Sequence, residues 1–147
     1  MPSTEFERFK KVLKASGNSV TKPRMRLFGL LQDSPALTMN QIIAELPAHD
    51  RVTAYRNVRL LEHLGILTSV RIGALTRVEL SDRFQHHHHH MTCINCGKVL
   101  VLKDNIAIEK EIERISGGTG FIITDHALEI RGVCQGCHKA ALRGSGG

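Results

Sequence analysis

The sequence predicts an α+β protein of two domains, and three observations support this expectation. Residues 5–64 contain four segments with apolar side chains at helical spacing, and two short apolar segments around Gly73-Ala74 then indicate a β hairpin. Five consecutive histidines, His86 to His90, precede a Cys-x-x-Cys pair, and a second such pair lies near the C-terminus. Because the character of the chain changes at the histidines, we expect domains over residues 1–84 and 85–147.

The first two helices are expected over Glu5 to Ser16 and from Thr21 onward. Gly17 follows the first helix as a C-terminal cap, and Thr21 is a suitable N-cap for the second, which tolerates Pro23 in its first turn. The apolar positions that define the two helical faces are Phe6, Phe9, Val12, Leu13, Met25, Leu27, Phe28, Leu30 and Leu31.

Two more helices and a hairpin complete the first domain. Thr38 with Gln41 three residues later forms a capping-box pattern, which opens a short helix that runs to Leu46 before Pro47. The fourth helix is expected over Val52 to Leu64, ended by Gly65. Strands are expected over Ile66 to Ile72 and Leu75 to Leu80. Helices followed by a hairpin in this order indicate a winged helix-turn-helix domain.

The fourth helix has the two faces that a DNA recognition helix needs. Ala54, Val58, Leu61 and Leu64 gather on one face, whereas Tyr55, Arg56, Arg59 and His63 lie opposite. Such a helix docks its apolar face on the domain while guanidinium and phenol groups reach phosphates and base edges. An ordinary surface helix would show the same pattern, so the prediction of DNA binding also depends on the hairpin and on charge.

The positive charge lies mostly in the first domain. The net charge is +6, and residues 1–85 hold 13 Lys and Arg against 8 Asp and Glu, whereas residues 86–147 hold 7 against 6. A basic excess favours a polyanionic partner such as double-stranded DNA, although a solvated surface alone often carries as much.

The second domain is expected to be a small α/β unit closed by the cysteines. A strand over His86 to Thr92 leads to a turn at Cys93 to Gly97 and a second strand over Lys98 to Leu102. A helix over Asp104 to Ile115 would be capped by Asp104 and ended by Gly117-Gly118. Two more strands, Phe121 to Thr124 and Ala127 to Arg131, would precede the second cysteine pair.

All four cysteines lie in the two pairs, Cys93 with Cys96 and Cys134 with Cys137. This spacing suits a tetrahedral structural Zn²⁺ site, because each short loop lets two thiolates reach one ion. Two disulfides or a redox pair are the alternatives. The sequence shows no signal-peptide pattern and no apolar run of about 18 residues, so we expect a cytoplasmic protein, without a membrane partner, whose thiols stay reduced.

The histidine run points to further metal sites. Because side chains alternate along a strand, His86, His88 and His90 would face one side and His87 and His89 the other. Each pair of imidazoles lies close enough to share one ion, and Glu79, Glu109 or His126 would supply another donor.

Several segments together are similar to the ferric uptake regulator family. The likeness extends over about residues 5–138, and its most specific part is the histidine run with the Cys-x-x-Cys-Gly-Lys sequence. The resemblance implies a homodimeric, metal-dependent transcription factor in which a winged helix-turn-helix domain precedes a dimerisation domain. The matching segments are Val52 to Val58, Arg77 to Leu80, His86 to His90, Thr92 to Val99, Thr124 to His126, and Gly132 to Cys137.

The same resemblance assigns roles to individual residues. Cys93, Cys96, Cys134 and Cys137 match the family's structural zinc site. His87, His89, Glu109 and His126 match its dimerisation-domain metal site, and Glu79, His88 and His90 match its regulatory site at the hinge between domains. Tyr55 and Arg56 match DNA-contacting positions, and Arg59 is a further candidate from the same face of the fourth helix. Because Ser19 replaces a lysine common in the family, Lys22, Arg24 and Lys14 are candidates for phosphate contact.

Two departures from the family pattern concern the hinge site. Leu37 stands where iron-sensing and peroxide-sensing members have a histidine ligand, and Val101 stands where an acidic residue is common. Asp82, His63 or water would have to complete the shell, or the site would bind metal weakly.

These observations lead to the hypothesis of a metal-sensing repressor that binds a palindromic DNA operator. Zn²⁺ would be structural, and a second Zn²⁺, Fe²⁺ or Mn²⁺ would regulate, with zinc favoured over iron because Leu37 removes a ligand. A metal-buffering protein and a zinc hydrolase are the alternatives from other classes. The chain has no His-Glu-x-x-His or similar zinc-enzyme motif, so we do not expect an enzyme.

Overall fold

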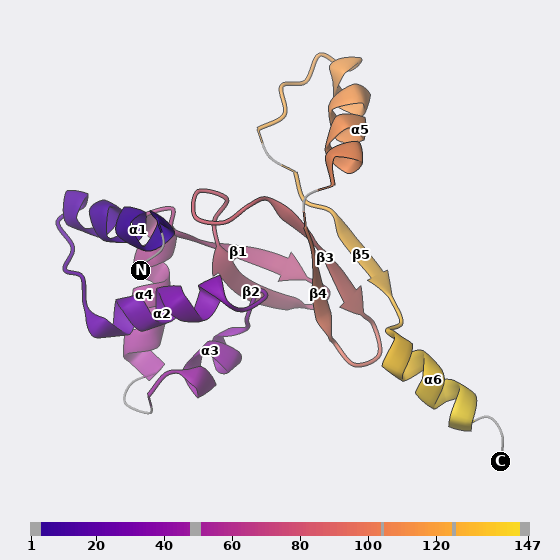
Figure 1. The fold of residues 1–147 in the computed structure, drawn as a ribbon, viewed down its shortest axis with the longest axis horizontal. Helices are drawn as coiled ribbons and strands as arrows, with labels where there is room; N and C mark the ends of the chain where they lie inside the picture. Colours follow the sequence, from indigo (N-terminus) through magenta and orange to yellow (C-terminus); the bar gives the residue numbers. More distant parts are fainter. Residues whose placement is uncertain (1–3, 48–50, 104, 125, 145–147) are drawn as a thin grey trace. The chain divides into compact units, whose positions relative to one another are not determined.

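The computed structural model describes residues 4–47, 51–103, 105–124 and 126–144 (Figure 1). The chain divides into two compact units, Met1–His86 and His87–Gly147. The boundary expected from the sequence, between residues 84 and 85, lies two residues earlier. Among the described residues, no helix is both long and apolar enough to cross a membrane.

The first unit contains helices and one hairpin, in the order that the sequence predicted. Helices α1 (Thr4–Ala15), α2 (Lys22–Gln32), α3 (Met39–Glu45) and α4 (Arg51–His63) precede strands β1 (Leu67–Ile72) and β2 (Leu75–Leu80). The two strands form a hairpin (Figure 1). They pair antiparallel, and Ile72 faces Leu75 across the turn at Gly73, whose φ is +62°. This is the expected winged helix-turn-helix arrangement.

The helix ends follow their predicted caps with one exception. At α3, Thr38 accepts a hydrogen bond from the Gln41 N–H, and Gln41 accepts one from the Thr38 N–H, so the capping box is confirmed. Gly17 and Gly65 adopt left-handed conformations after α1 and α4. Thr21 occupies the N-cap position of α2, but its side chain makes no capping hydrogen bond.

A phenylalanine cluster forms the centre of the first unit. The rings of Phe9 and Phe28 stack with centroids 4.4 Å apart, and Phe6 and Phe84 meet Phe28 edge-on at 5.5 and 5.7 Å. Aromatic pairs in such geometry add about 0.5–1.5 kcal/mol beyond area burial. Since Phe84 follows β2, this cluster also anchors the end of the unit on α1 and α2.

A buried arginine connects the hairpin to the start of α3. Arg77 on β2 is 8% exposed, and its Nη1 donates to the Ala36 carbonyl at 3.3 Å and to Gln41 Oε1 at 3.2 Å. Leu37 and Val78 exchange backbone hydrogen bonds at 2.9 and 2.7 Å beside it. These bonds hold Leu37 beside Val78, the residue that precedes Glu79.

The second unit places the histidine strand at the centre of a three-stranded sheet. The order is β4 (Val99–Lys103), β3 (His88–Cys93), β5 (Glu129–Gly132), with β3 antiparallel to β4 and parallel to β5 (Figure 1). Helix α5 (Ile106–Gly117) lies between β4 and β5 in the chain, and α6 (Gln135–Gly144) follows β5.

The second unit differs from the sequence-based expectation in three places. The strand expected over Phe121 to Thr124 is wrong: the segment has no regular structure, and Phe121 and Ile122 are 79% and 90% exposed. Helix α6 was not expected, because the second Cys-x-x-Cys masked the helical pattern that continues from it. The expected cap Asp104 lies outside the described residues, and the Asn105 side chain caps α5 by accepting from the Ala107 N–H at 3.0 Å.

Candidate metal centres and nucleic-acid interface

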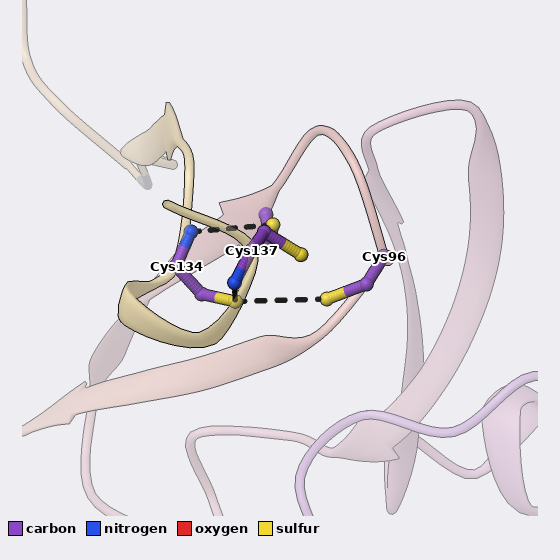
Figure 2. A group of neighbouring side chains, drawn as sticks. Cys96, Cys134 and Cys137 are labelled. Atoms are coloured by element: carbon purple, nitrogen blue, oxygen red, sulfur yellow. Dashed lines mark hydrogen bonds between the residues drawn. The ribbon is translucent and has the colours of Figure 1, made fainter. Parts of the chain in front are cut away.

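The four cysteines converge at one point of the second unit. Cys93 ends β3, Cys96 lies in the following turn, Cys134 precedes α6 and Cys137 lies in its first turn. Their sulfur atoms all lie within 4.8 Å of one another, and none is in a disulfide. Figure 2 shows the Cys96 and Cys134 sulfurs facing each other, 3.8 Å apart. A tetrahedral ion with Zn–S bonds of ~2.3 Å needs sulfurs about 3.8 Å apart, so the set fits zinc.

Backbone amides prepare part of this cluster for the thiolate form. The Cys134 N–H donates to Cys93 Sγ at 3.3 Å and is the main reason that the pKa of Cys93 falls to about 6. The Cys137 N–H donates to Cys134 Sγ at 3.5 Å and lowers the pKa of Cys134. Hydrogen bonding to Cys134 instead raises the pKa of Cys137 to about 12. Without metal, Cys93, Cys134 and Cys137 therefore hold their protons unequally, and a binding cation would have to displace the proton of Cys137, which is held most strongly of the three.

The second cluster joins three histidines and a glutamate. Donor atoms of His87, His89, Glu109 and His126 all lie within 4.8 Å of one another. His89 Nε2 lies 2.9 Å from Glu109 Oε1, His126 Nε2 lies 3.2 Å from Glu109 Oε2, and the Nε2 atoms of His87 and His126 are 3.1 Å apart. A tetrahedral zinc ion with bonds of ~2.0–2.1 Å would need donors about 3.4 Å apart, so small shifts would complete the shell.

Strand β3 carries His89, helix α5 carries Glu109, and His87 and His126 lie in the segments that precede β3 and β5. His87 and His89 are two residues apart, as the predicted alternation requires, and their rings lie edge to face with centroids 4.9 Å apart. Burial acts to raise the pKa of Glu109, but the hydrogen bond with His89 and the nearby charges of His126 and His87 outweigh it and hold the pKa below its usual value. The carboxylate is therefore ionised and ready to bind a cation.

One side of this cluster is open. A cavity of about 400 Å³ is bounded by two of its members, Glu109 and His126. The other lining residues are Ile112, Glu113, Ser116 and Ile123. Access from this side suits an ion that exchanges with the solution rather than one that is locked into the fold.

The predicted hinge residues divide between the two units. His88 and His90 have ring centroids 4.8 Å apart on β3, whereas Glu79 belongs to β2 of the first unit. Val101 and Leu37, the two positions that depart from the expected ligand pattern, each lie beside one of these residues or its neighbour in the chain. Val101 pairs with His90 in the β3–β4 register, and Leu37 bridges to Val78, the neighbour of Glu79. The side chains of Leu37 and Val101 are aliphatic, so neither supplies the further donor that the resemblance led us to expect.

The predicted DNA-binding face of α4 is exposed. Tyr55 is 44% exposed, and Arg56 and Arg59 are also exposed, whereas Ala54 and Leu61 are buried against the helices of the first unit. Lys22, in the first turn of α2, and Lys14 are exposed as well. The expected separation into an apolar and a basic face is therefore present.

Arg24 differs from these residues because it is bonded within the protein. Its Nη1 donates to the Ser19 carbonyl at 2.6 Å, and its Nε donates to Asn57 Oδ1 at 3.2 Å. Asn57 lies on the buried face of α4 and is 9% exposed. Sequence reasoning missed Asn57, although a polar residue on an otherwise apolar helix face was the signal that could have revealed it.

Comparison with known proteins places this arrangement among metal regulators. The model of the ferric uptake regulator family matches residues 15–131. The chain is 34% identical over 142 residues to the ferric uptake regulation protein of Campylobacter jejuni subsp. jejuni, which covers 91% of this chain and 88% of that protein.

Solved structures share the fold. The ferric uptake regulator of Helicobacter pylori aligns with a TM-score of 0.77 at 20% identity and covers 92% of both chains. That of Vibrio cholerae aligns with a TM-score of 0.69 at 27% identity, covering 86% of this chain and 99% of the other.

Proposed function

Since this chain belongs to the ferric uptake regulator family, we propose that it is a zinc-responsive repressor that binds a palindromic operator as a homodimer in the cytoplasm. Membership makes it a metal-responsive transcription regulator and not an enzyme, and regulators of this family bind DNA and act as dimers. The choice of zinc, repression and the operator symmetry are the parts that we propose.

The observation that carries the choice of zinc is the cluster of His87, His89, Glu109 and His126. Three imidazoles and one carboxylate within 4.8 Å supply four donors, the number that tetrahedral zinc takes. Manganese(II) is better suited by carboxylate, carbonyl and water oxygens, whereas iron(II) also accepts imidazoles with a carboxylate but typically keeps open coordination positions. Iron is the second candidate, because several relatives are named ferric uptake regulation proteins.

We assign the remaining metal ligands as follows. Cys93, Cys96, Cys134 and Cys137 would hold a structural zinc that closes the second unit. Glu79, His88 and His90 would form a weaker site, because Leu37 and Val101 supply no donors beside them. Regulation would therefore depend mainly on the cluster around Glu109.

On DNA, the exposed face of α4 would enter the major groove. Arg56 and Arg59 would contact bases or phosphates and Tyr55 would lie against the groove, while Lys22 would add a phosphate contact. A dimer would place two such helices on successive major grooves. Metal would act only through its higher affinity for the arrangement that fits the operator.

The test uses a duplex selected by the wild-type protein from a random DNA pool in the presence of zinc. Affinity for this duplex is measured at fixed salt, because phosphate contacts make it steeply dependent on ionic strength. Buffered Zn²⁺, Fe²⁺ under anaerobic conditions, Mn²⁺ and a chelator are compared. We expect zinc to tighten binding most, and an equal or larger effect of iron would overturn the assignment of zinc.

A pair of variants links the response to the cluster. His126→Ala removes one donor and should abolish the zinc response while leaving weak DNA binding intact. His138→Ala, which removes an exposed imidazole from α6, should respond like the wild type. If His126→Ala kept the full response, the cluster would not be the sensing site.

A further inference from the structure

Arg24 connects three parts of the first unit through two hydrogen bonds. From the first turn of α2, its Nη1 reaches the carbonyl of Ser19 at 2.6 Å, and its Nε reaches Oδ1 of Asn57 on α4 at 3.2 Å. The side chain is half-buried, and Asn57 is 9% exposed. A guanidinium carries several donors in a fixed planar arrangement, which lets one side chain serve two separate acceptors.

Asn57, the acceptor on α4, lies on the buried face of that helix. Asn57 follows Arg56 directly and lies among Ala54, Val58 and Leu61, which form the buried apolar face of the helix. Apolar packing decides which face of the helix is buried, but because apolar contacts have no preferred direction it sets the fine rotation of the helix less sharply than a directional contact does. A hydrogen bond depends on direction, and one at Asn57 therefore restricts the rotation that aims its neighbours outward.

We propose that Arg24 is a positioning residue for DNA recognition rather than a phosphate contact. Its bond to Asn57 sets the rotation of α4, and hence the direction in which Tyr55 and Arg56 point. Its bond to Ser19 holds the segment before α2 in register with that helix. The inference rests on the proposed DNA-binding role of α4, and it reassigns a residue whose charge alone pointed to a phosphate.

The first experiment separates positioning from charge. Affinity for the duplex selected by the wild-type protein is measured at several salt concentrations for Arg24→Lys and Arg24→Gln. Lysine keeps the charge but lacks the planar set of donors that spans Ser19 and Asn57. We expect both variants to bind about tenfold more weakly than the wild type, with an unchanged slope of log affinity against log salt.

A phosphate contact predicts a different pattern. Arg24→Lys would then bind within about twofold of the wild type, and Arg24→Gln would reduce the salt slope by about one. Either result would overturn the proposal. Lys22→Gln is the matched control, since it removes an exposed charge from the same turn and should lower the slope.

A double-mutant cycle with Asn57→Ala tests the partner. If Arg24 acts through Asn57, the double variant Arg24→Lys/Asn57→Ala should bind DNA no more weakly than either single variant. Additive losses would contradict the proposal. Urea unfolding of the same four proteins gives an independent measure of the contact, and zero coupling there would also contradict it.

Different measurements test this inference and the proposed function. If the wild-type protein selected no duplex at all, the DNA-binding proposal would fail. The unfolding cycle would still decide whether Arg24 and Asn57 are coupled.

Discussion

Arg56 is the residue whose side chain most directly separates a DNA-binding regulator from a metal buffer. It is exposed on α4 beside Tyr55, and no metal-ligand cluster of the described residues includes it. We expect Arg56→Ala to weaken binding to the selected duplex by roughly tenfold or more, about 1–3 kcal/mol if a base contact is lost. Bound zinc, measured by elemental analysis, should not change.

The control for this prediction is Arg143→Ala, which removes the same charge from an exposed position on α6. It should leave DNA affinity within about twofold of the wild type at fixed salt. If both variants lost affinity equally, net charge rather than the recognition face would account for binding.

The pKa of Glu109 predicts how stability depends on pH. A carboxyl group whose pKa is lower in the folded state stabilises the fold above its unfolded value and loses this contribution as pH falls through the folded value. The pKa of Glu109 is lowered in the folded state, so the stability difference between wild type and Glu109→Gln in metal-free protein should shrink as the pH falls through the acidic range in which this carboxyl becomes protonated. Urea unfolding followed by circular dichroism from pH ~6 to ~3.5 tests this.

Glu113→Gln, one turn further along α5 and exposed, controls for the loss of a charge from this helix. It should not reproduce the pH dependence. A difference for Glu109→Gln that stayed constant over the whole pH range would show that the carboxylate is not stabilised by its histidine neighbours.

Among the helices, the start of α3 is stabilised by one side-chain oxygen, that of Gln41, which accepts two hydrogen bonds. Gln41 Oε1 accepts from the Thr38 N–H at 2.9 Å and from Arg77 Nη1 at 3.2 Å. Thr38→Ala should therefore cost about 1 kcal/mol, as for an ordinary cap. Gln41→Ala should cost more, about 1–3 kcal/mol, because it also removes a partner from a buried guanidinium whose Nε already has none among the described residues.

Urea unfolding of the two variants gives the comparison. Glu45→Ala, at the other end of α3 and exposed, should be nearly neutral. A Gln41 variant no less stable than the Thr38 variant would contradict the account of Arg77 as a link between the hairpin and α3.

Elements with a local signal were predictable from the sequence. The capping box of α3, the glycines after α1 and α4, and the alternation of histidines on β3 each follow from short-range chemistry, and all are present. The segment Phe121 to Thr124 shows the limit, because an apolar run indicates burial or pairing without saying whether a neighbouring strand exists.

The candidate sites likewise combine residues that local spacing predicts with residues whose role depends on distant parts of the chain. The Cys-x-x-Cys spacing predicted that the two thiolates of each pair reach one ion, and the parallel pairing of β3 with β5, in which Cys93 lies opposite Gly132, brings the two pairs together. The contribution of Asn57 was not predictable, because its hydrogen bond joins residues 33 positions apart and depends on how α2 and α4 pack. Long-range polar contacts of this kind leave little trace in a single sequence.

At the scale of the whole molecule, the two units should depend differently on metal. The core of the first unit is built from apolar side chains, whereas the second unit brings together four thiols and leaves many apolar residues exposed. Structural zinc in small domains contributes on the order of 10–16 kcal/mol apparent. We expect Cys96→Ala to unfold the second unit while the first keeps its structure.

Amide hydrogen exchange on the full chain measures this, and chelation of the wild-type protein should reproduce the result. His138→Ala, beside Cys137, serves as a control that should retain both units. Full protection of the second unit in Cys96→Ala would show that the cysteines do not hold it together.

Metal binding at the cluster around Glu109 and DNA binding by α4 should be coupled. One thermodynamic cycle measures this coupling: duplex affinity with and without buffered zinc, and zinc affinity with and without the duplex. We expect each ligand to tighten the binding of the other by the same factor, roughly 5- to 150-fold, because linkage is reciprocal. Duplex affinity that is identical with and without zinc would show that the two sites are not coupled.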